Sequence, residues 1–486
     1  MTGVQVTTSA RTGPLAGVQA EESTLFIVGQ AERGRVDRSV LVRSLAEFTK
    51  EFGDRVTYGA LYDQVRTYFE EGGGRAQVAR VVGPAATLGT LTLSDAAGSP
   101  VPTLRIDALA PGAFSTRLSV QVSAGSTADL FTLTVRLDGV VMETYTDLAT
   151  PAAAATALSA SSLVRGTDLG SATAAPDNNP DVLAATPLSA GTDDRASITA
   201  THQLNALTRF VPGQGTGVVT VPELPIASVA VGLAAHCAAN NRVGLVASDA
   251  GASHATVKSD RATATAAILA AGGHPEYVAH IGGQITIPDT GGVIRTISPV
   301  GFAAAKRAEA IADAGVWRAP AGEVSKARFV LGVTEDLDAA AAQDYDAAGV
   351  VPIVLVAGVP WLYGWRSLSN DTANYRLLTA RDVLNLLVVR CSDALQQYVF
   401  RPIDDGGRLL ALVYSELVGI LDPIAQAKGL YSVNGDGGYS VDVGPSVNPP
   451  EALATNTIAA VISARPAPTA ETIQLTIIKA GPTAAV

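Results

Sequence analysis

The segment Thr24-Leu-Phe-Ile-Val-Gly29 carries four consecutive large apolar residues between a polar residue and a glycine. A short apolar run with such boundaries is typical of a strand that is buried on both faces. Two helix signals follow it. Ser44 precedes Glu47 by three positions, which is the spacing of a capping box, and a second helical pattern over 58–71 ends at three glycines. These features predict an α/β unit over residues 21–83.

The composition of the whole chain limits what this unit belongs to. The chain has 486 residues, of which 47% are hydrophobic and 16% are charged, and its net charge is −11. At ~150 residues per domain, this length predicts about three domains, and so apolar a chain is not globally disordered. The acidic balance argues against nucleic acid and against an anionic membrane surface as partners.

Cysteines and apolar runs indicate the compartment. Cys237 and Cys391 lie in apolar stretches, where buried free thiols are the ordinary state, and this pattern favours folding in the cytoplasm. The N-terminus has no basic and apolar regions of a signal peptide. The longest apolar runs, 350–363 and 409–421, are shorter than the ~20 residues of a spanning helix. We therefore expect no direct membrane insertion.

The character of the chain changes along its length. Residues 84–200 contain no lysine, five arginines and eleven acidic residues, a net charge of 5 − 11 = −6. Alternating segments joined by the hairpin signal Asp138-Gly139 predict a β-rich domain there. Residues 201–364 alternate between helical and strand patterns, including a buried parallel strand over 350–357. Helices and then short strands are expected over 365–464.

Both ends of the chain are short β-prone arms beside hinge residues. Such a strand is unstable alone in water and must pair with a sheet, in its own chain or in another. Both kinds of pairing remain open from the residues alone. The predicted strand residues of the arms are Val4, Val6 and Thr8, with Ile473, Leu475 and Ile477, and the predicted hinges are Gly13, Pro14, Gly17, Pro466 and Pro468.

A collinear series of motifs then links the chain to a known family. No single motif is specific, but their order is. The series is Thr24-Leu-Phe-Ile-Val-Gly29, Ala31-Glu-Arg-Gly34, Tyr68-Phe-Glu-Glu-Gly-Gly73, Pro111-Gly-Ala-Phe-Ser-Thr116, Gly315-Val-Trp-Arg-Ala-Pro320, Trp365-Arg-Ser-Leu-Ser369 and Val447-Asn-Pro-Pro-Glu451. In this order the chain resembles the tail sheath proteins of contractile phage tails and of related contractile injection systems.

The resemblance implies a multidomain α/β fold with a mechanical role. It implies a subtilisin-like core that is not a working protease, an inserted β-rich domain, a helical and β C-terminal domain, and extended terminal arms that add strands to neighbouring subunits. Implied partners are further copies of the chain, an inner tube protein, and baseplate and tail terminator proteins. The implied location is a virion tail sheath or an injection particle, assembled in the cytoplasm. The expected division is 1–20, 21–83, 84–200, 201–364, 365–464 and 465–486.

No catalytic, metal or cofactor site is expected from the sequence. The five histidines lie in no sharp motif, and the nucleophile-elbow and phosphate-loop patterns are absent. His274 and His280 flank a strand entry and lack zinc spacing. Trp317, Trp365 and Arg366 are candidate interface residues, although the tryptophans equally suit a core. Two alternatives remain open, namely an inactive or cryptic subtilisin-like serine hydrolase and a non-contractile polymerising shell protein.

Overall fold

A seven-stranded sheet forms the centre of the molecule. The computed structural model describes residues 6–8, 11–13, 22–289, 292–404 and 406–471. Neighbouring strands of the central sheet are parallel, except that β4 is antiparallel to β5. In order across the sheet, the strands are β19 (Val350–Val351), β15 (Val278–Ile281), β14 (Val243–Ala247), β13 (Val218–Thr220), β3 (Leu25–Gly29), β5 (Ala76–Arg80) and β4 (Val40–Val42).

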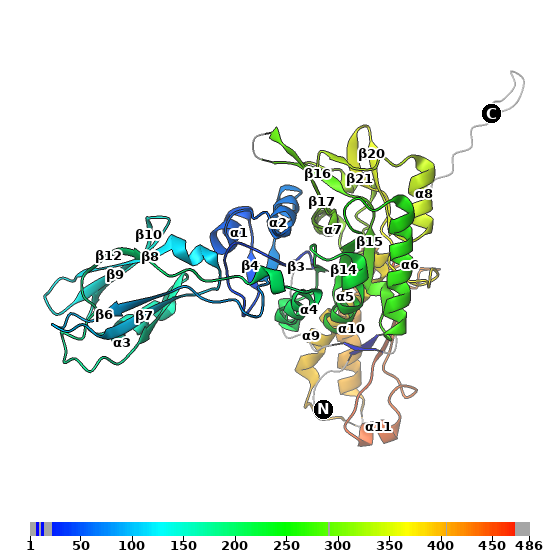
Figure 1. Ribbon diagram of the computed structural model, residues 1–486. Coiled ribbons are helices and arrows are strands. Elements are labelled where there is room, and N and C mark those ends of the chain that lie inside the picture. The colour runs from blue at the N-terminus through cyan, green and yellow to red at the C-terminus, as the bar shows by residue number, and fades with distance from the viewer. Residues whose placement is uncertain (1–5, 9–10, 14–21, 290–291, 405, 472–486) are drawn as a thin grey trace, which may run out of the picture.

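Helices cover both faces of this sheet, as Figure 1 shows. Successive side chains of a strand point to opposite faces. Accordingly, Leu25 and Ile27 of β3 belong to one buried cluster, and Phe26 and Val28 belong to another. The first cluster includes α1 (Leu45–Phe52), α2 (Leu61–Glu70) and α7 (Val300–Ala314), and the second includes α5 (Ile226–Asn240) and α6 (His254–Ala270). The predicted two-faced burial of 24–29 is confirmed.

The Ser44 cap of α1 is also confirmed. Its side chain accepts a hydrogen bond from the Glu47 backbone N–H, and the Glu47 carboxylate accepts one from the Arg43 backbone N–H.

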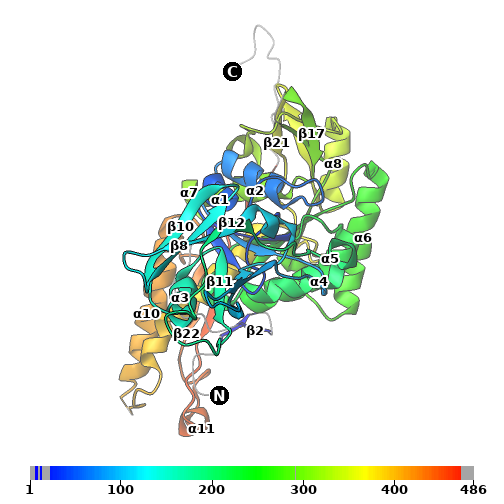
Figure 2. The same ribbon diagram turned by 60° about the vertical axis from the view of Figure 1, so that its left-hand side comes forward.

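A β sandwich stands off the body on two connecting segments (Figures 1 and 2). Its hairpin turn at Asp138-Gly139 has positive φ at both residues, as the sequence predicts for a two-residue loop. A separate apolar cluster fills the space between its two sheets. The sheets are β10 (Val140–Leu148), β9 (Phe131–Leu137), β8 (Leu118–Ala124) and β12 (Leu183–Pro187), and β11 (Val164–Asp168), β7 (Pro102–Ala108) and β6 (Thr90–Ser94), with α3 (Pro151–Ala157) alongside.

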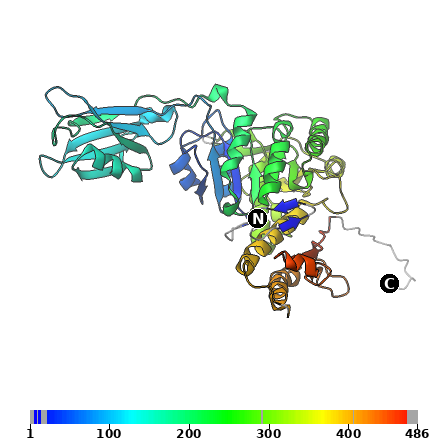
Figure 3. The same cartoon turned by 90° about the horizontal axis from the view of Figure 1, so that it is seen from below.

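The C-terminal part lies on the side of the body seen at the bottom of Figures 1 and 3. Two long helices, α9 (Leu378–Leu395) and α10 (Arg408–Gln426), pack against each other and carry a small sheet. That sheet consists of β22 (Tyr439–Asp442) and β23 (Val461–Ala464), with the short helix α11 (Pro450–Ala454) between them in sequence.

The described chain has several further, smaller α-helices and strands. They are β1 (Val6–Thr8), β2 (Arg11–Gly13), α4 (Ala200–Asn205), β16 (Ile285–Pro288), β17 (Ile294–Ile297), β18 (Gly332–Val333), α8 (Ala339–Ala347), β20 (Ile353–Val356) and β21 (Val359–Leu362).

One strand prediction is wrong in its extent. The apolar run 350–357 was expected to form a single parallel strand, but only Val350 and Val351 join the central sheet as β19. Pro352 has no backbone N–H to donate to a ladder, so the parallel strand ends there. The chain then pairs as the antiparallel hairpin of β20 and β21.

Candidate functional site

The two-stranded sheet of β22 and β23 has no third strand among the described residues. Its register is fixed, with Tyr439 opposite Ala464 and Asp442 opposite Val461. The side chains of Tyr439, Val441, Ile462 and Ala464 face the apolar clusters under α9 and α10. One face of this small sheet is therefore anchored, while its strand edges still offer backbone N–H and C=O groups to a further strand.

The helices beneath this sheet explain why so small a sheet persists. Leu421 and Val383 are completely buried between α10 and α9, beside the inward side chains of the strands. The Tyr439 hydroxyl also donates to the Asp422 carboxylate of α10. Burial and this hydrogen bond raise the pKa of Tyr439 to about 12, so the hydroxyl stays protonated as a donor. A two-stranded hairpin is marginal in water unless it packs on such a support.

The N-terminal arm is described only in part. Val4, Pro14 and Gly17 lie outside the described residues. β1 and β2 form an antiparallel hairpin, in which Val6 is opposite Gly13 and Thr8 is opposite Arg11. This hairpin lies near α9 and α5 (Figure 3). Gly13 was expected to be a hinge residue and is instead the last residue of β2. It lies in a strand because β1 and β2 of the same arm pair with each other.

The predicted strand of the C-terminal arm, with Ile473, Leu475 and Ile477, lies outside the described residues. The residues before it are held to the body. Pro466 is bridged to Leu430, and the Ala467 backbone N–H donates to the Gly429 carbonyl oxygen. Pro466 is therefore part of a short ladder, contrary to its prediction as a hinge, whereas Pro468 is exposed and lies beyond the ladder.

Arg366 fixes the point at which the C-terminal arm leaves the body. The residue is 3% exposed, and its guanidinium pairs with the carboxylates of Asp346 and Glu471. Burial lowers the pKa of Arg366, but the hydrogen bonds to both carboxylates outweigh burial and raise the pKa overall. Arg366 is thus a buried residue whose charge is neutralised by two acidic side chains of its own chain, and a role at an interface between copies stays a prediction.

The candidate interface tryptophans also lie against their own chain. Trp365 is 1% exposed and belongs to the main core cluster, so of the two roles that the sequence left open for it, this burial favours the core. Trp317 is half-buried beside the cluster under α9 and α10. Its ring lies so close to Gly315 and Gly429 that a Cβ atom at either position would approach it within 2.6 Å. Packing thus accounts for both side chains.

A carboxylate that accepts backbone hydrogen bonds lies at the place where an α/β sheet of this kind usually binds a ligand. The strand order reverses between β3 and β13, and ligands of such sheets bind beyond the carboxyl ends of the strands at that point. Here the Glu223 carboxylate accepts hydrogen bonds from the backbone N–H groups of Gln30 (2.9 Å) and Ala60 (3.2 Å). Burial raises the pKa of Glu223 overall, although these hydrogen bonds lower it. The carboxylate thus links the segment after β13 to the segments that follow β3 and precede α2.

A serine and a histidine do meet at the ends of β14 and β15. The Ser248 hydroxyl lies 3.1 Å from the His280 Nε2 atom. His280 is fully buried, and burial together with the charge of Arg261 lowers its pKa to about 3. Its Nδ1 atom has no hydrogen-bond partner within the described ranges, so no carboxylate orients the ring as a catalytic triad requires. The pair is a buried hydrogen bond rather than an activated nucleophile.

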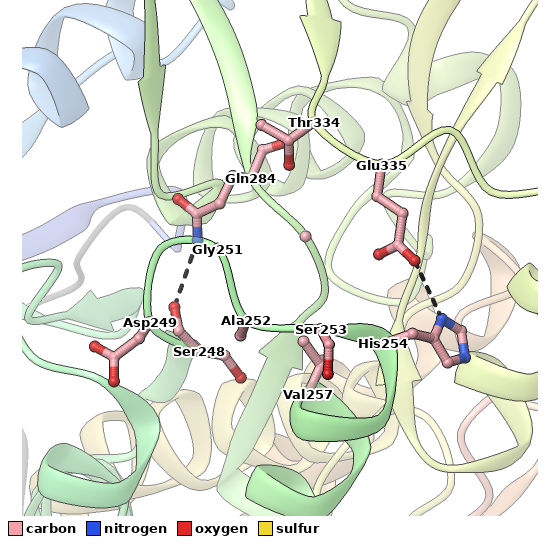
Figure 4. A pocket seen from close by; sticks show the side chains of 11 residues that line it. Ser248, Asp249, Gly251, Ala252, Ser253, His254, Val257, Gln284, Thr334 and Glu335 are labelled. Carbon is pink, nitrogen blue, oxygen red and sulfur yellow. Dashed lines mark hydrogen bonds and ion pairs between the residues drawn. The ribbon is translucent and has the colours of Figure 1, made fainter.

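A pocket of about 340 Å³ lies beside Ser248, between the start of α6 and the segment before α8 (Figure 4). The Gln284 side chain reaches toward the Ser248 backbone oxygen, and His254 faces Glu335. His254 also hydrogen-bonds to Asp344 at 2.8 Å. No group of three or more metal-ligating residues occurs in the part of the chain that the structure describes. The hydrogen bond between His254 and Asp344 thus connects α6 to α8 beside the pocket.

Buried ion pairs join the separate parts of the fold. Arg80, which is 0% exposed, donates to the Asp193 carboxylate at 2.6 Å, at the joint between the body and the β sandwich. Arg80 also donates to the carbonyl oxygens of Pro111 (2.9 Å), Gly34 (3.0 Å) and Ala31 (3.1 Å). The sequence did not reveal this joint, because its members are far apart in the chain and each looks like an ordinary charged residue.

Helix α10 is longer than its apolar run suggests. It spans Arg408–Gln426, and within the described ranges it is the one helix whose length and composition would suffice to cross a membrane, with a mean hydropathy of 1.4 over its window. Length therefore does not exclude a span, contrary to the expectation from the run 409–421. Leu409, Val413, Leu417 and Leu421 form its buried face, but only 28% of this window is buried in the single molecule.

Comparison with known proteins identifies the architecture. No family model and no curated protein matches the sequence. Solved structures do match over nearly the whole chain. The sheath tail protein of Listeria innocua has a TM-score of 0.62 at 14% identity and covers 88% of this chain and 90% of its own. The sheath tail protein of Desulfitobacterium hafniense has a TM-score of 0.56 at 14% identity, with 91% and 93% covered.

A contracted assembly is among the matches. The helical sheath of the anti-feeding prophage, in its contracted state, has a TM-score of 0.57 at 15% identity and covers 98% of both chains. The two folds thus align over nearly all of both chains, and the mixed α/β fold that the resemblance implied is confirmed at this level. This chain has the fold of the sheath proteins of contractile tails and contractile injection systems.

Proposed function

We propose that the chain is the structural subunit of a contractile sheath. Copies polymerise around an inner tube, and contraction of the sheath drives the tube through a cell envelope. The observation that carries the proposal is the open sheet of β22 and β23, in a chain whose fold aligns with that of sheath proteins over most of its length. Further partners are a baseplate, a tail terminator and the tube protein, and the particle is a phage tail or an injection device.

Each segment of the chain has its own role in the proposed sheath. Residues 1–20 and 465–486 are the arms, and 84–200 is the protruding domain. The α/β body consists of 21–83 and 201–364 and has a subtilisin-like topology, while 365–464 is the domain that accepts strands. Arms from other copies extend β22 or β23, because strand addition satisfies backbone groups on an exposed sheet edge. Alternating apolar residues of the arm then give each added strand one face for the supporting helices.

Strand exchange suits a sheath that changes shape. The strands stay paired while the bodies rotate, provided that a few residues between arm and body absorb the change in backbone angles. Work then comes from contacts between bodies that are better in the contracted state. A gain of ~1–3 kcal/mol per copy, the size of an ordinary coupling energy, becomes large over the many copies of a sheath. No bound nucleotide is needed for this.

A matched pair of variants tests the arms. Replacing Ile473, Leu475 and Ile477 together by serine removes one face of the C-terminal strand, and we expect purified or co-expressed protein to stay unassembled in negative-stain images. Replacing Thr472, Gln474 and Thr476 by serine changes the opposite face of the same strand and should leave hollow tubes. Deleting residues 1–10 should likewise prevent full-length extended tubes. Normal tubes from the first variant and from the deletion would contradict the proposal.

The alternatives predict other results. A hydrolase with a Ser248 nucleophile would be labelled by a fluorophosphonate probe, whereas the buried Ser248–His280 pair supports no labelling. A non-contractile shell would form flat lattices, or tubes of one length only. The proposed sheath forms tubes of two lengths and diameters.

A further inference from the structure

The last described residues of the chain are held to the body at two places. At the first, the Ala467 backbone N–H donates to the Gly429 carbonyl oxygen at 3.0 Å. At the second, the Glu471 carboxylate pairs with two arginines. We call residues 468–471 the strap. Residues 468–470 are exposed and make no hydrogen bond to another described residue, so Glu471 alone holds the end of the strap.

The site that receives Glu471 is built by residues outside the strap. The Arg366 guanidinium donates from Nε to one oxygen of Asp346 in α8, at 2.6 Å, and from Nη2 to the other oxygen. The Ser367 backbone N–H donates to the Arg376 carbonyl oxygen at 3.1 Å, which pairs the segments that carry the two arginines. Both arginines are therefore positioned by contacts that do not involve Glu471.

Glu471 is held by charge at a partly exposed position. Its carboxylate accepts hydrogen bonds from Nη1 and, at 3.1 Å, from Nη2 of Arg366, and it lies 3.5 Å from the Arg376 Nε atom. The Glu471 side chain is 32% exposed. If Glu471 leaves, Asp346 still neutralises the buried Arg366, and Arg376 is 48% exposed to water. Opening thus leaves no unpaired buried charge, which is what makes the loss of a buried pair costly.

The two attachments of the strap differ in strength. The first continues into a run of backbone hydrogen bonds, in which the Arg465 N–H donates to the Gly438 carbonyl oxygen at 2.9 Å and the Tyr431 N–H donates to the Arg465 carbonyl oxygen at 2.8 Å. The second is a single side chain. A pull on the chain beyond Glu471 reaches this side chain first, because it is the attachment nearer to the C-terminus. The ion pair therefore opens before the backbone hydrogen bonds do.

We propose that Glu471 is a releasable latch that sets the reach of the C-terminal arm. With the latch closed, 486 − 471 = 15 residues lie beyond the last attachment that the structure describes. With the latch open, the last attachment is Ala467, and 486 − 467 = 19 residues lie beyond it. The four residues of the strap add at most ~14 Å of reach. The latch is a property of the single chain and goes beyond the proposed function, because it concerns the reach of the arm and not what the arm binds.

The distance between two spin labels on the unassembled full chain tests the latch. Thr469→Cys places one label on the strap, and Thr263→Cys places the other on the exposed side of α6, while the two native cysteines are buried. Pulsed electron paramagnetic resonance should give a narrow distribution for closed chains and a broad one for open chains. Glu471→Gln removes the charge and keeps the size of the side chain. It should raise the ratio of open to closed chains by roughly three- to tenfold, between the effects of an exposed ion pair and of a charge-assisted hydrogen bond.

Two controls separate a latch from a general change in the fold. Glu451→Gln makes the same substitution at an exposed position in α11 and should leave the distance distribution unchanged. Raising the NaCl concentration from 0.1 M to 1 M shortens the Debye length from about 10 Å to about 3 Å. This change should open the latch in the chain with Glu471 and have little further effect in Glu471→Gln. The melting temperature should stay the same in Glu471→Gln, because Arg366 keeps Asp346.

Two results would overturn the inference. One is a broad distribution in the chain with Glu471 at 0.1 M NaCl, which would mean that the latch is not closed. The other is the same narrow distribution with and without the Glu471 charge, which would mean that this charge does not hold the strap. Either result leaves the sheath proposal standing, because the formation of tubes tests that proposal separately.

Discussion

Replacing Arg80 by methionine is expected to weaken the joint between the body and the β sandwich. The guanidinium is completely buried and holds the Asp193 carboxylate, which is 6% exposed, together with several backbone carbonyl oxygens. Methionine fills similar space but leaves the buried carboxylate without its main partner. Breaking such a pair costs about 3–5 kcal/mol. In a unit of ~150–250 residues, at roughly 2–4 °C per kcal/mol, the melting temperature should fall by about 6–20 °C.

Thermal unfolding followed by circular dichroism measures this change. Arg318→Met is the control, because the side chains of Arg318 and its partner Asp313 are both exposed, by 45% and 51%, and a pair at the surface contributes only about 0–1 kcal/mol. The double variant Arg80→Met with Asp193→Leu should regain part of the loss, since no unpaired buried charge remains. Equal melting temperatures for Arg80→Met and the unchanged protein would refute the reasoning.

Two further predictions concern the body. Burial lowers the pKa of His280 to about 3, so the unfolded chain takes up the proton at a higher pH than the folded chain does. The free energy of unfolding therefore falls as the pH drops from about 6.5 toward 3. His280→Gln should reduce the loss of melting temperature between pH 7 and pH 4, and an unchanged loss would contradict this assignment. Glu223→Ala leaves the Gln30 and Ala60 N–H groups unpaired and should cost about 1–3 kcal/mol in a denaturant titration, whereas Glu323→Ala at an exposed position should cost nothing measurable.

Local patterns in the sequence predicted much of the fold. The apolar run at 24–29, the Ser44 cap and the Asp138-Gly139 turn each depend on neighbouring residues, and each forms as expected. The extent of the strand after Val350 was wrong because Pro352 sends the chain into a different sheet. A single proline in an apolar run does not tell which sheet the residues on either side of it will join.

The candidate site was harder to predict, because its features arise between distant parts of the chain. Alternation and hinge residues predicted the arms, and the short strands expected within 365–464 form as β22 and β23. That these two strands pair with each other could not be predicted, because 18 residues lie between Asp442 and Val461. The sequence singled out Arg366 only as a candidate interface residue and gave no role to Arg80, because only the fold brings carboxylates to them. A tryptophan such as Trp365 gives no sign in sequence of whether a core or a partner covers it.

The most direct test of strand exchange is a cryo-EM reconstruction of the polymer that the full chain forms. We predict that the sheet of β22 and β23 is extended, on one or both edges, by strands that trace to the arms of other copies. The reconstruction would contradict this account if β22 and β23 stayed a two-stranded sheet and both arms folded back onto their own molecule.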